Sequence, residues 1–214
     1  MVQKQYNDKL PGQLIIISSP SGAGKTSITN KLLELYDDLL LSVSVTTRIK
    51  RENEQEGKDY FFITKEEYEK LVQNNQLLEY AEVFGNYYGT PKQFVLEKLQ
   101  EGKNVIFDID WQGARALTQH QEFNIVTIFI LPPSMITLRN RLINRGLDSE
   151  DIIKSRMLQA KTEISHYAEY DYVILNDVFE TAVGKIKKII DFHNLTAIKS
   201  KDFDSFVKND LISS

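Results

Sequence analysis

The sequence LIIISSPSGAGKT, residues 14–26, decides the fold of this chain. Its first four residues are large and apolar, a run that is typical of a strand covered on both faces of a parallel sheet. Gly22 and Gly24 then allow the backbone to turn so that successive N–H groups face an anion. A helix is expected to begin near Lys25, and the positive end of its dipole favours the same anion. The stretch therefore predicts a cradle for nucleotide phosphates.

The cradle matches the P-loop pattern G-x-x-x-x-G-K-[ST] except at its first position, where Ser19 replaces glycine. Serine is small and tolerated in turns, so we interpret the stretch as a variant of the motif. Lys25 would place its charge on the β- and γ-phosphates, and the Thr26 hydroxyl would be a ligand of Mg²⁺. The alternative, an ordinary glycine-rich turn, is disfavoured by the Lys-Thr pair that directly follows glycine. A P-loop by itself predicts nucleotide binding and leaves the reaction open.

The composition excludes several classes of function. The chain has 214 residues, a net charge of −4 and no cysteine. Disulfides, thiolate metal sites and a cysteine nucleophile are therefore excluded, and the acidic balance disfavours nucleic acid as a main partner. No apolar run is long enough to cross a bilayer, and the first 13 residues lack a signal-peptide core. We expect a cytoplasmic protein without a membrane partner.

Strand-like and helix-like patterns alternate along most of the chain. Further buried strands are predicted at residues 39–45, 105–109, 125–131 and 172–175. With helices between them, they predict an α/β protein with a five-stranded parallel sheet in three layers. Residues 44–91 interrupt this alternation with short aromatic strands and one helix, so we expect an inserted, mixed α+β lobe. The predicted division is an N-terminal arm (1–13), a P-loop core (14–43 and 92–195), that lobe (44–91), a helical lid (about 145–157) and a tail (196–214).

Two arginines at the start of the lobe, Arg48 and Arg51, suggest a second phosphate site. Guanidinium groups bind phosphate through paired, charge-assisted hydrogen bonds, and Tyr60 and the pair Tyr87-Tyr88 could add phenolic donors. The alternative is a solvated basic turn whose charge is balanced by Glu52, Glu54 and Glu56. Taken alone, this pattern favours the alternative.

Three carboxylates are candidates for nucleotide and metal contacts. Glu79 lies in an apolar stretch, where it could accept two hydrogen bonds from the N1–H and N2–H₂ groups of guanine; an exposed strand position is the alternative. Asp108 and Asp110 follow a buried strand and share one face at its carboxyl end, where open α/β sheets bind ligands. They could organise Mg²⁺ or its waters. Asp110 also suits the N-cap of the next helix.

Arginines also gather in the last third of the chain. Arg141 and Arg145 are four residues apart on one predicted helix, so they share a face, and Arg156 follows on the next helix. Phosphoryl transfer depends on positioning and positive charge rather than on covalent catalysis, and these residues could supply that charge. Ordinary surface arginines on an amphipathic helix are the alternative.

Taken together, these motifs resemble those of the guanylate kinase family. The resemblance covers nearly all of residues 14–195 and rests on SPSGAGKT, SVSVTTR followed by Arg51, GKDYFF, AEVFGNYYGT, DIDWQGA, the helix with Arg141 and Arg145, HYAEYDY and the pair Asn176-Asp177. It implies transfer of phosphate from ATP, with Mg²⁺, to GMP bound in the lobe. Oligomeric state stays open between a monomer and a homo-oligomer. The chain departs from the family pattern around Arg48 and Arg51: Lys50, between them, replaces a proline, and Asn53, two residues after Arg51, replaces a glycine.

The resemblance also implies individual roles. ATP would be bound by Ser19, Pro20, Ser21, Gly22, Ala23, Gly24, Lys25, Thr26 and Asn176. The guanine base would be read by Ser44, Glu79 and Thr90, and the GMP phosphate would be held by Arg48, Arg51, Tyr60 and Tyr88. Asp108 and Asp110 would lie beside the nucleotide and metal, with Asp108 reaching Mg²⁺ through water. Lys25 and the lid arginines Arg141, Arg145 and Arg156 would be catalytic. Rival interpretations are an interaction module that binds phosphopeptide and a related kinase with another acceptor.

Overall fold

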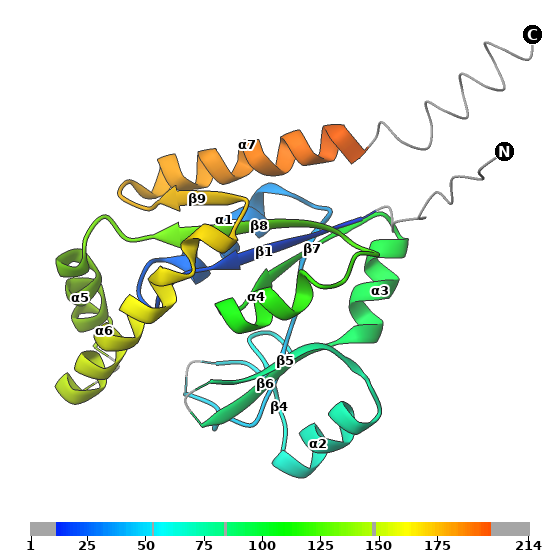
Figure 1. Ribbon diagram of the computed structural model, residues 1–214, viewed down its shortest axis with the longest axis horizontal. Helices are drawn as coiled ribbons and strands as arrows, with labels where there is room; N and C mark the ends of the chain where they lie inside the picture. The colour runs from blue at the N-terminus through cyan, green and yellow to red at the C-terminus, as the bar shows by residue number, and fades with distance from the viewer. Residues whose placement is uncertain (1–11, 53, 84, 147–148, 198–214) are drawn as a thin grey trace, which may run out of the picture.

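A parallel sheet forms the centre of the protein in the computed structural model, which describes residues 12–52, 54–83, 85–146 and 149–197. Its five strands run in the order β2 (Leu39–Leu41), β7 (Asn104–Asp108), β1 (Gln13–Ser18), β8 (Asn124–Leu131) and β9 (Tyr172–Leu175) (Figure 1). This confirms the predicted five-stranded parallel sheet. The order reverses direction at β1, which lies between β7 and β8, and the crevice beyond such a switch point is where open α/β sheets bind ligands.

Helices cover both faces of this sheet. Side chains alternate along β1, so Ile15 and Ile17 pack toward α1 (Lys25–Leu35) and α7 (Phe179–Ala197). Leu14 and Ile16 face the opposite way, toward α3 (Lys92–Gln100) and α4 (Trp111–Leu117). All four β1 side chains are fully buried, and each contributes about 1.5–3 kcal/mol of hydrophobic stabilisation. The result is the predicted three-layer architecture.

Two further helices lie beyond the carboxyl ends of the strands, where α5 (Met135–Asn144) packs on α6 (Glu150–Ser165) (Figure 1). Serine caps begin both: Ser134 accepts from Thr137 N, and Ser149 accepts from Ile152 N. A short 3₁₀ turn, η1 (Tyr167–Glu169), leads from α6 back to the sheet. These helices bring chain from residues 135–165 next to the P-loop.

A second, smaller sheet packs with one helix in the stretch predicted to form the lobe. Its strands run in the order β4 (Phe61–Phe62), β3 (Val45–Thr46), β6 (Asn86–Pro91) and β5 (Leu77–Val83), with β3 and β4 parallel and the other pairs antiparallel. Helix α2 (Lys65–Gln73) starts at a capping box in which Thr64 and Glu67 bond each other's backbone amides. The mixed α+β character is therefore confirmed.

One strand prediction was wrong. Residues 39–45 do not form a single strand, because the chain leaves the large sheet after β2 and enters the small one at β3. The last bond to the large sheet is Ser42 N to Ile106 O, at 2.9 Å, and Val45 already pairs with Gly89. Most of the predicted arm and tail, together with Asn53, lie outside the described residues. Within the described part, no helix is long and apolar enough to cross a membrane.

Candidate active site

A cavity of about 1590 Å³ opens at the carboxyl ends of the parallel strands, between the large sheet, the small sheet and helix α6. It is lined by most of the predicted site residues: Ser19, Pro20, Ser21, Gly22, Gly24, Lys25, Thr26, Ser44, Arg48, Arg51, Tyr60, Glu79, Tyr88, Asp108, Asp110, Arg141, Arg145, Arg156 and Asn176. Ala23 and Thr90 are fully buried behind its wall. Residues that are far apart in the sequence are therefore gathered around one space.

The P-loop connects β1 to α1 and has the backbone shape of an anion site. Gly22 and Gly24 have φ of +91° and +100°, a region that side chains make costly. Gly24 is also the N-cap residue of α1, which therefore begins without a side-chain cap. The amides of its first turn are left for a ligand, and the helix dipole adds to their attraction for phosphate.

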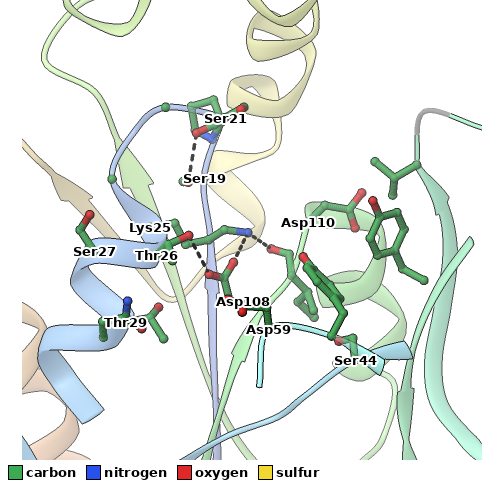
Figure 2. Close-up of a pocket in the computed structure, with 18 of the residues that line it drawn as sticks. Ser19, Ser21, Lys25, Thr26, Ser27, Thr29, Ser44, Asp59, Asp108 and Asp110 are labelled. Atoms are coloured by element: carbon green, nitrogen blue, oxygen red, sulfur yellow. Dashed lines mark hydrogen bonds and ion pairs between the residues drawn. The ribbon is translucent and has the colours of Figure 1, made fainter. Parts of the chain in front are cut away.

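Lys25, Thr26 and Asp108 meet at the floor of the cavity (Figure 2). The Lys25 ammonium lies 2.6 Å from Asp108 Oδ1 and donates to the Ile109 carbonyl at 3.1 Å. The Thr26 hydroxyl donates to Asp108 Oδ2 at 3.4 Å. The carboxylate of Asp108, at the end of β7, thus contacts both Lys25, which was predicted to bind phosphate, and Thr26, which was predicted to bind the metal.

Mg²⁺ fits the oxygen donors at this point. Thr26 supplies a hydroxyl and Asp108 a carboxylate, which are ligands that this hard cation prefers. The described residues include no group of three or more acidic or histidine side chains that could hold a metal on its own. An ion here would therefore take most of its ligands from nucleotide phosphates and water, as Mg²⁺ does in kinase sites.

Glu79, on β5, is the most deeply buried carboxylate of the cavity, with 4% of its surface exposed. The Thr90 hydroxyl donates to Glu79 Oε1 at 2.7 Å and lies 3.3 Å from the Ser44 hydroxyl. Burial raises the pKa of Glu79 to about 7. The hydrogen bond from Thr90 lowers this pKa, and the nearby charge of Asp110 raises it further. The alternative of an exposed strand position is therefore excluded.

Arg48 forms a cluster with Tyr60, Tyr88 and Glu54, and Arg51 joins it through Glu54. Arg48 Nη2 donates to Glu54 Oε1 at 2.6 Å, and the Arg51 amide donates to Oε2 at 2.9 Å. The Arg48 guanidinium lies 5.5 Å from the centre of the Tyr60 ring, which packs edge-on against Tyr88. Only 15% of the Arg48 side chain and 12% of the Glu54 side chain are exposed, so a solvated turn does not describe this pair, whereas 48% of the Arg51 side chain is exposed.

The arginines of α5 and α6 reach the P-loop from the other side. Arg141 donates to the Asn176 carbonyl at 3.0 Å and to the Ala23 carbonyl at 3.4 Å, and Arg156 donates to Ser21 Oγ at 2.5 Å. Asn176 itself is buried, and its amide donates to Ala23 O at 2.7 Å. Arg145, directly after α5, lines the cavity. Arg141 and Arg156 are thus half-buried against the P-loop, whereas Arg145 is exposed at the edge of the cavity.

Asp110 caps helix α4, as the sequence suggested, by accepting a hydrogen bond from the Gly113 amide at 3.0 Å. Two acidic residues of the site were missed. Glu54 was interpreted as a solvated counter-charge, and its position three residues after Arg51 was the available signal. Glu163 was not considered, although it follows Arg156 by seven residues on one helix, a spacing that places both on the same face.

The fold and this cavity define the class, a P-loop nucleotide phosphotransferase, because a P-loop with uncapped helix amides and a second group of arginines line one space. The comparisons specify the family. A family model described as guanylate kinase matches residues 11–193, and the chain belongs to this family of ATP:GMP phosphotransferases.

Known relatives agree with this assignment. Guanylate kinase of Maricaulis maris is 48% identical over 202 residues, or 94% of this chain and 93% of the relative. Guanylate kinase of Rickettsia bellii is 53% identical over 182 residues, covering 85% of this chain and 95% of the relative. The crystal structure of guanylate kinase from Anaplasma phagocytophilum superimposes with a TM-score of 0.77 at 36% identity, covering 95% of this chain and 97% of that one.

Proposed function

We propose that this chain binds ATP·Mg²⁺ on the P-loop and GMP in the lobe formed by residues 44–91, and transfers the γ-phosphate from one to the other. The observation that carries the proposal is the pairing of two cationic phosphate sites on one cavity. Lys25 and the α1 amides form the first site, and the cluster of Arg48 and Arg51 forms the second. A protein that only binds one nucleotide needs one such site.

The acceptor base is guanine because of Glu79. Its ionised carboxylate can accept hydrogen bonds from the adjacent N1–H and N2–H₂ groups of guanine, whereas adenine presents no such pair of donors. Thr90 holds one carboxylate oxygen, and Ser44 extends this polar wall of the pocket. The phosphate of GMP would be held by Arg48, Arg51 and the hydroxyls of Tyr60 and Tyr88, which lie together on one side of the cavity. Burial raises the pKa of Tyr60, so its hydroxyl stays protonated and can donate.

The donor nucleotide is bound mainly by backbone. The loop from Ser19 to Thr26 would enclose its phosphates, and Mg²⁺ would bind the Thr26 hydroxyl, with Asp108 acting through water. When bound, the ion supplies positive charge to the phosphate oxygens. Asn176 would lie toward the adenine base. Its buried Oδ1 has no hydrogen-bond partner among the described residues, and a nucleotide could reach this acceptor only if the side chain moved.

Transfer itself needs position and charge rather than a base. The attacking oxygen belongs to the phosphate of GMP, which is already ionised near neutral pH, so no proton has to be removed. Lys25, Arg141, Arg145 and Arg156 line the cavity, and they would supply positive charge where negative charge develops on the transferred group. We expect the segment near residues 145–157 to act as a lid that excludes water and limits hydrolysis of ATP.

The test is a comparison of acceptors. ADP production from ATP·Mg²⁺ should be fast with GMP and slow with AMP, UMP or dTMP. Absence of GMP-dependent turnover by the folded protein would refute the proposal. GMP binding without any turnover would instead support an interaction module, and faster turnover with another nucleotide would indicate a related kinase. We expect the reaction in the cytoplasm, by a monomer or a homo-oligomer.

A further inference from the structure

Helix α6 contacts one residue of the P-loop, Ser21, in two ways. Glu163 Oε2 accepts a hydrogen bond from the Ser21 amide at 3.3 Å, and Arg156 Nη1 donates to the Ser21 hydroxyl at 2.5 Å. Glu163 and Arg156 are seven residues apart, about two helical turns, so both lie on the face of α6 that meets the loop. Figure 2 shows Ser21 at the turn of the loop beside this helix.

The carboxylate of Glu163 lies among the charges of the donor site. Its pKa is raised by burial, although Lys25 and Arg156 favour the ionised form. Asp110 faces the same region and opposes ionisation. An acidic side chain is unexpected beside a cradle for phosphate, because it repels the ligand that the cradle binds. Its contact with a backbone amide offers a reason for its presence.

Ser21 precedes the two glycines that bend the loop. The Ser21 amide donates to Glu163, while the first turn of α1 has no side-chain cap and its residues Lys25 and Thr26 line the cavity. The curvature at Gly22 and Gly24 is costly for other residues but is not itself rigid, since glycine has many accessible conformations. The hydrogen bond from the Ser21 amide to Glu163, just before these glycines, limits the conformations that the loop can take.

We propose that Glu163 is a positioning residue of the donor site: by holding the Ser21 amide it keeps the P-loop in the shape that binds phosphate, and together with Arg156 it joins α6 to that loop. The proposal rests on the proposed function only in taking the P-loop ligand to be a nucleoside di- or triphosphate. The opposite possibility is that the carboxylate merely competes with phosphate for the loop. The two possibilities predict effects of opposite sign.

The test is calorimetric titration of ADP·Mg²⁺ into the full chain and its variants without GMP, so that no turnover occurs. In E163A the Ser21 amide loses its acceptor, and we expect the affinity for ADP to fall about tenfold, since a hydrogen bond to a charged group is worth that much or more. In E163Q the side-chain carbonyl can still accept, so the affinity should stay within about threefold of the wild type. E97Q, which removes an exposed carboxylate on α3, serves as the matched control and should change nothing.

A second variant keeps the test decisive if E163A is poorly folded. Methionine is about as long as glutamate and is a good helix former, but its side chain cannot accept the hydrogen bond from the Ser21 amide. The E163M variant should therefore lose as much ADP affinity as E163A. The affinity for GMP should be unchanged in every variant. Unchanged or tighter ADP binding in E163A and E163M would overturn the positioning role, and tighter binding would indicate charge competition. Since these titrations need no acceptor, failure of GMP turnover in the wild type would refute the proposed function separately.

Discussion

Replacing Glu79 by glutamine should make the protein more stable and less able to bind GMP. In the native protein burial raises the pKa of Glu79 to about 7, from an ordinary value of 4.5. The unfolded chain therefore loses this proton near pH 4.5, while the native state keeps it up to about pH 7. Between these values the unfolded state binds fewer protons, so the free energy of unfolding falls as the pH rises.

The magnitude follows from the size of this difference. Each pKa unit corresponds to about 1.4 kcal/mol, so ionised Glu79 costs roughly 3 kcal/mol of stability above pH 7. Glutamine does not titrate and its carbonyl can still accept the Thr90 hydrogen bond. The E79Q variant should therefore match the wild type near pH 4.5 and exceed it by up to roughly 3 kcal/mol at pH 8.

Urea unfolding at pH 5 and pH 8 measures this effect, with E69Q as control because Glu69 is an exposed carboxylate in the same lobe. Calorimetry at pH 8 measures the functional cost. The NH₂ group of glutamine would lie opposite the N–H donors of guanine and could not accept their hydrogen bonds. The affinity for GMP should therefore fall about 100-fold, as expected for two lost charge-assisted hydrogen bonds. An E79Q protein that keeps the wild-type pH slope, or that binds GMP normally, would refute this account of the site.

Three other substitutions test separate parts of the site. Lys25→Ala removes the cation beside Asp108, so the rate of phosphoryl transfer should fall by about 100- to 1000-fold. The affinity for GMP, measured by calorimetry, should stay unchanged. Loss of GMP binding would contradict the division between the two substrate sites. Gly113→Ala would place a Cβ 2.8 Å from Glu79 Oε2. We expect the free energy of unfolding in urea to fall by about 1–3 kcal/mol and GMP binding to weaken. A variant with wild-type stability and GMP affinity would show that Glu79 moves freely. Glu54→Gln removes the negative charge that pairs with Arg48; burial raises the pKa of Glu54, but the Arg48 hydrogen bond and charge lower it overall. The variant should lose about 2 kcal/mol near pH 7, and this deficit should shrink as the pH falls through the native pKa, because wild-type Glu54 then becomes protonated as well; a deficit that is independent of pH would rule out the ion pair as its cause.

Features that depend on neighbouring residues along the chain were predictable from sequence. The turn at Gly22 and Gly24, the capping box of Thr64 and Glu67, and the cap by Asp110 each involve residues within a few positions of one another. Their hydrogen bonds form wherever the local backbone allows them. Alternation of strands and helices predicted the parallel sheet for the same reason, since each buried strand shows its apolar character locally.

Features that depend on distant contacts were not predictable in this way. The break between β2 and β3 follows from the pairing of Val45 with Gly89, 44 positions later, and nothing in residues 39–45 marks it. The burial of Glu79 depends on the approach of α4, whose Gly113 leaves room for the carboxylate. Glu163 reaches Ser21 across 142 positions of sequence.

The sequence by itself determined that this chain has a P-loop on a parallel α/β sheet, because backbone bending, helix initiation and strand burial are local properties of residues 14–26 and of the strands that follow. Only the tertiary structure decided which charged side chains are solvated and which belong to the site. The apolar stretch around Glu79 marked it as a candidate, but nothing in the sequence separated Glu54 and Glu163 from solvated carboxylates, and their roles arise from burial and from partners that folding brings near. A charge in a site is defined by its surroundings, and those surroundings exist only in the folded chain.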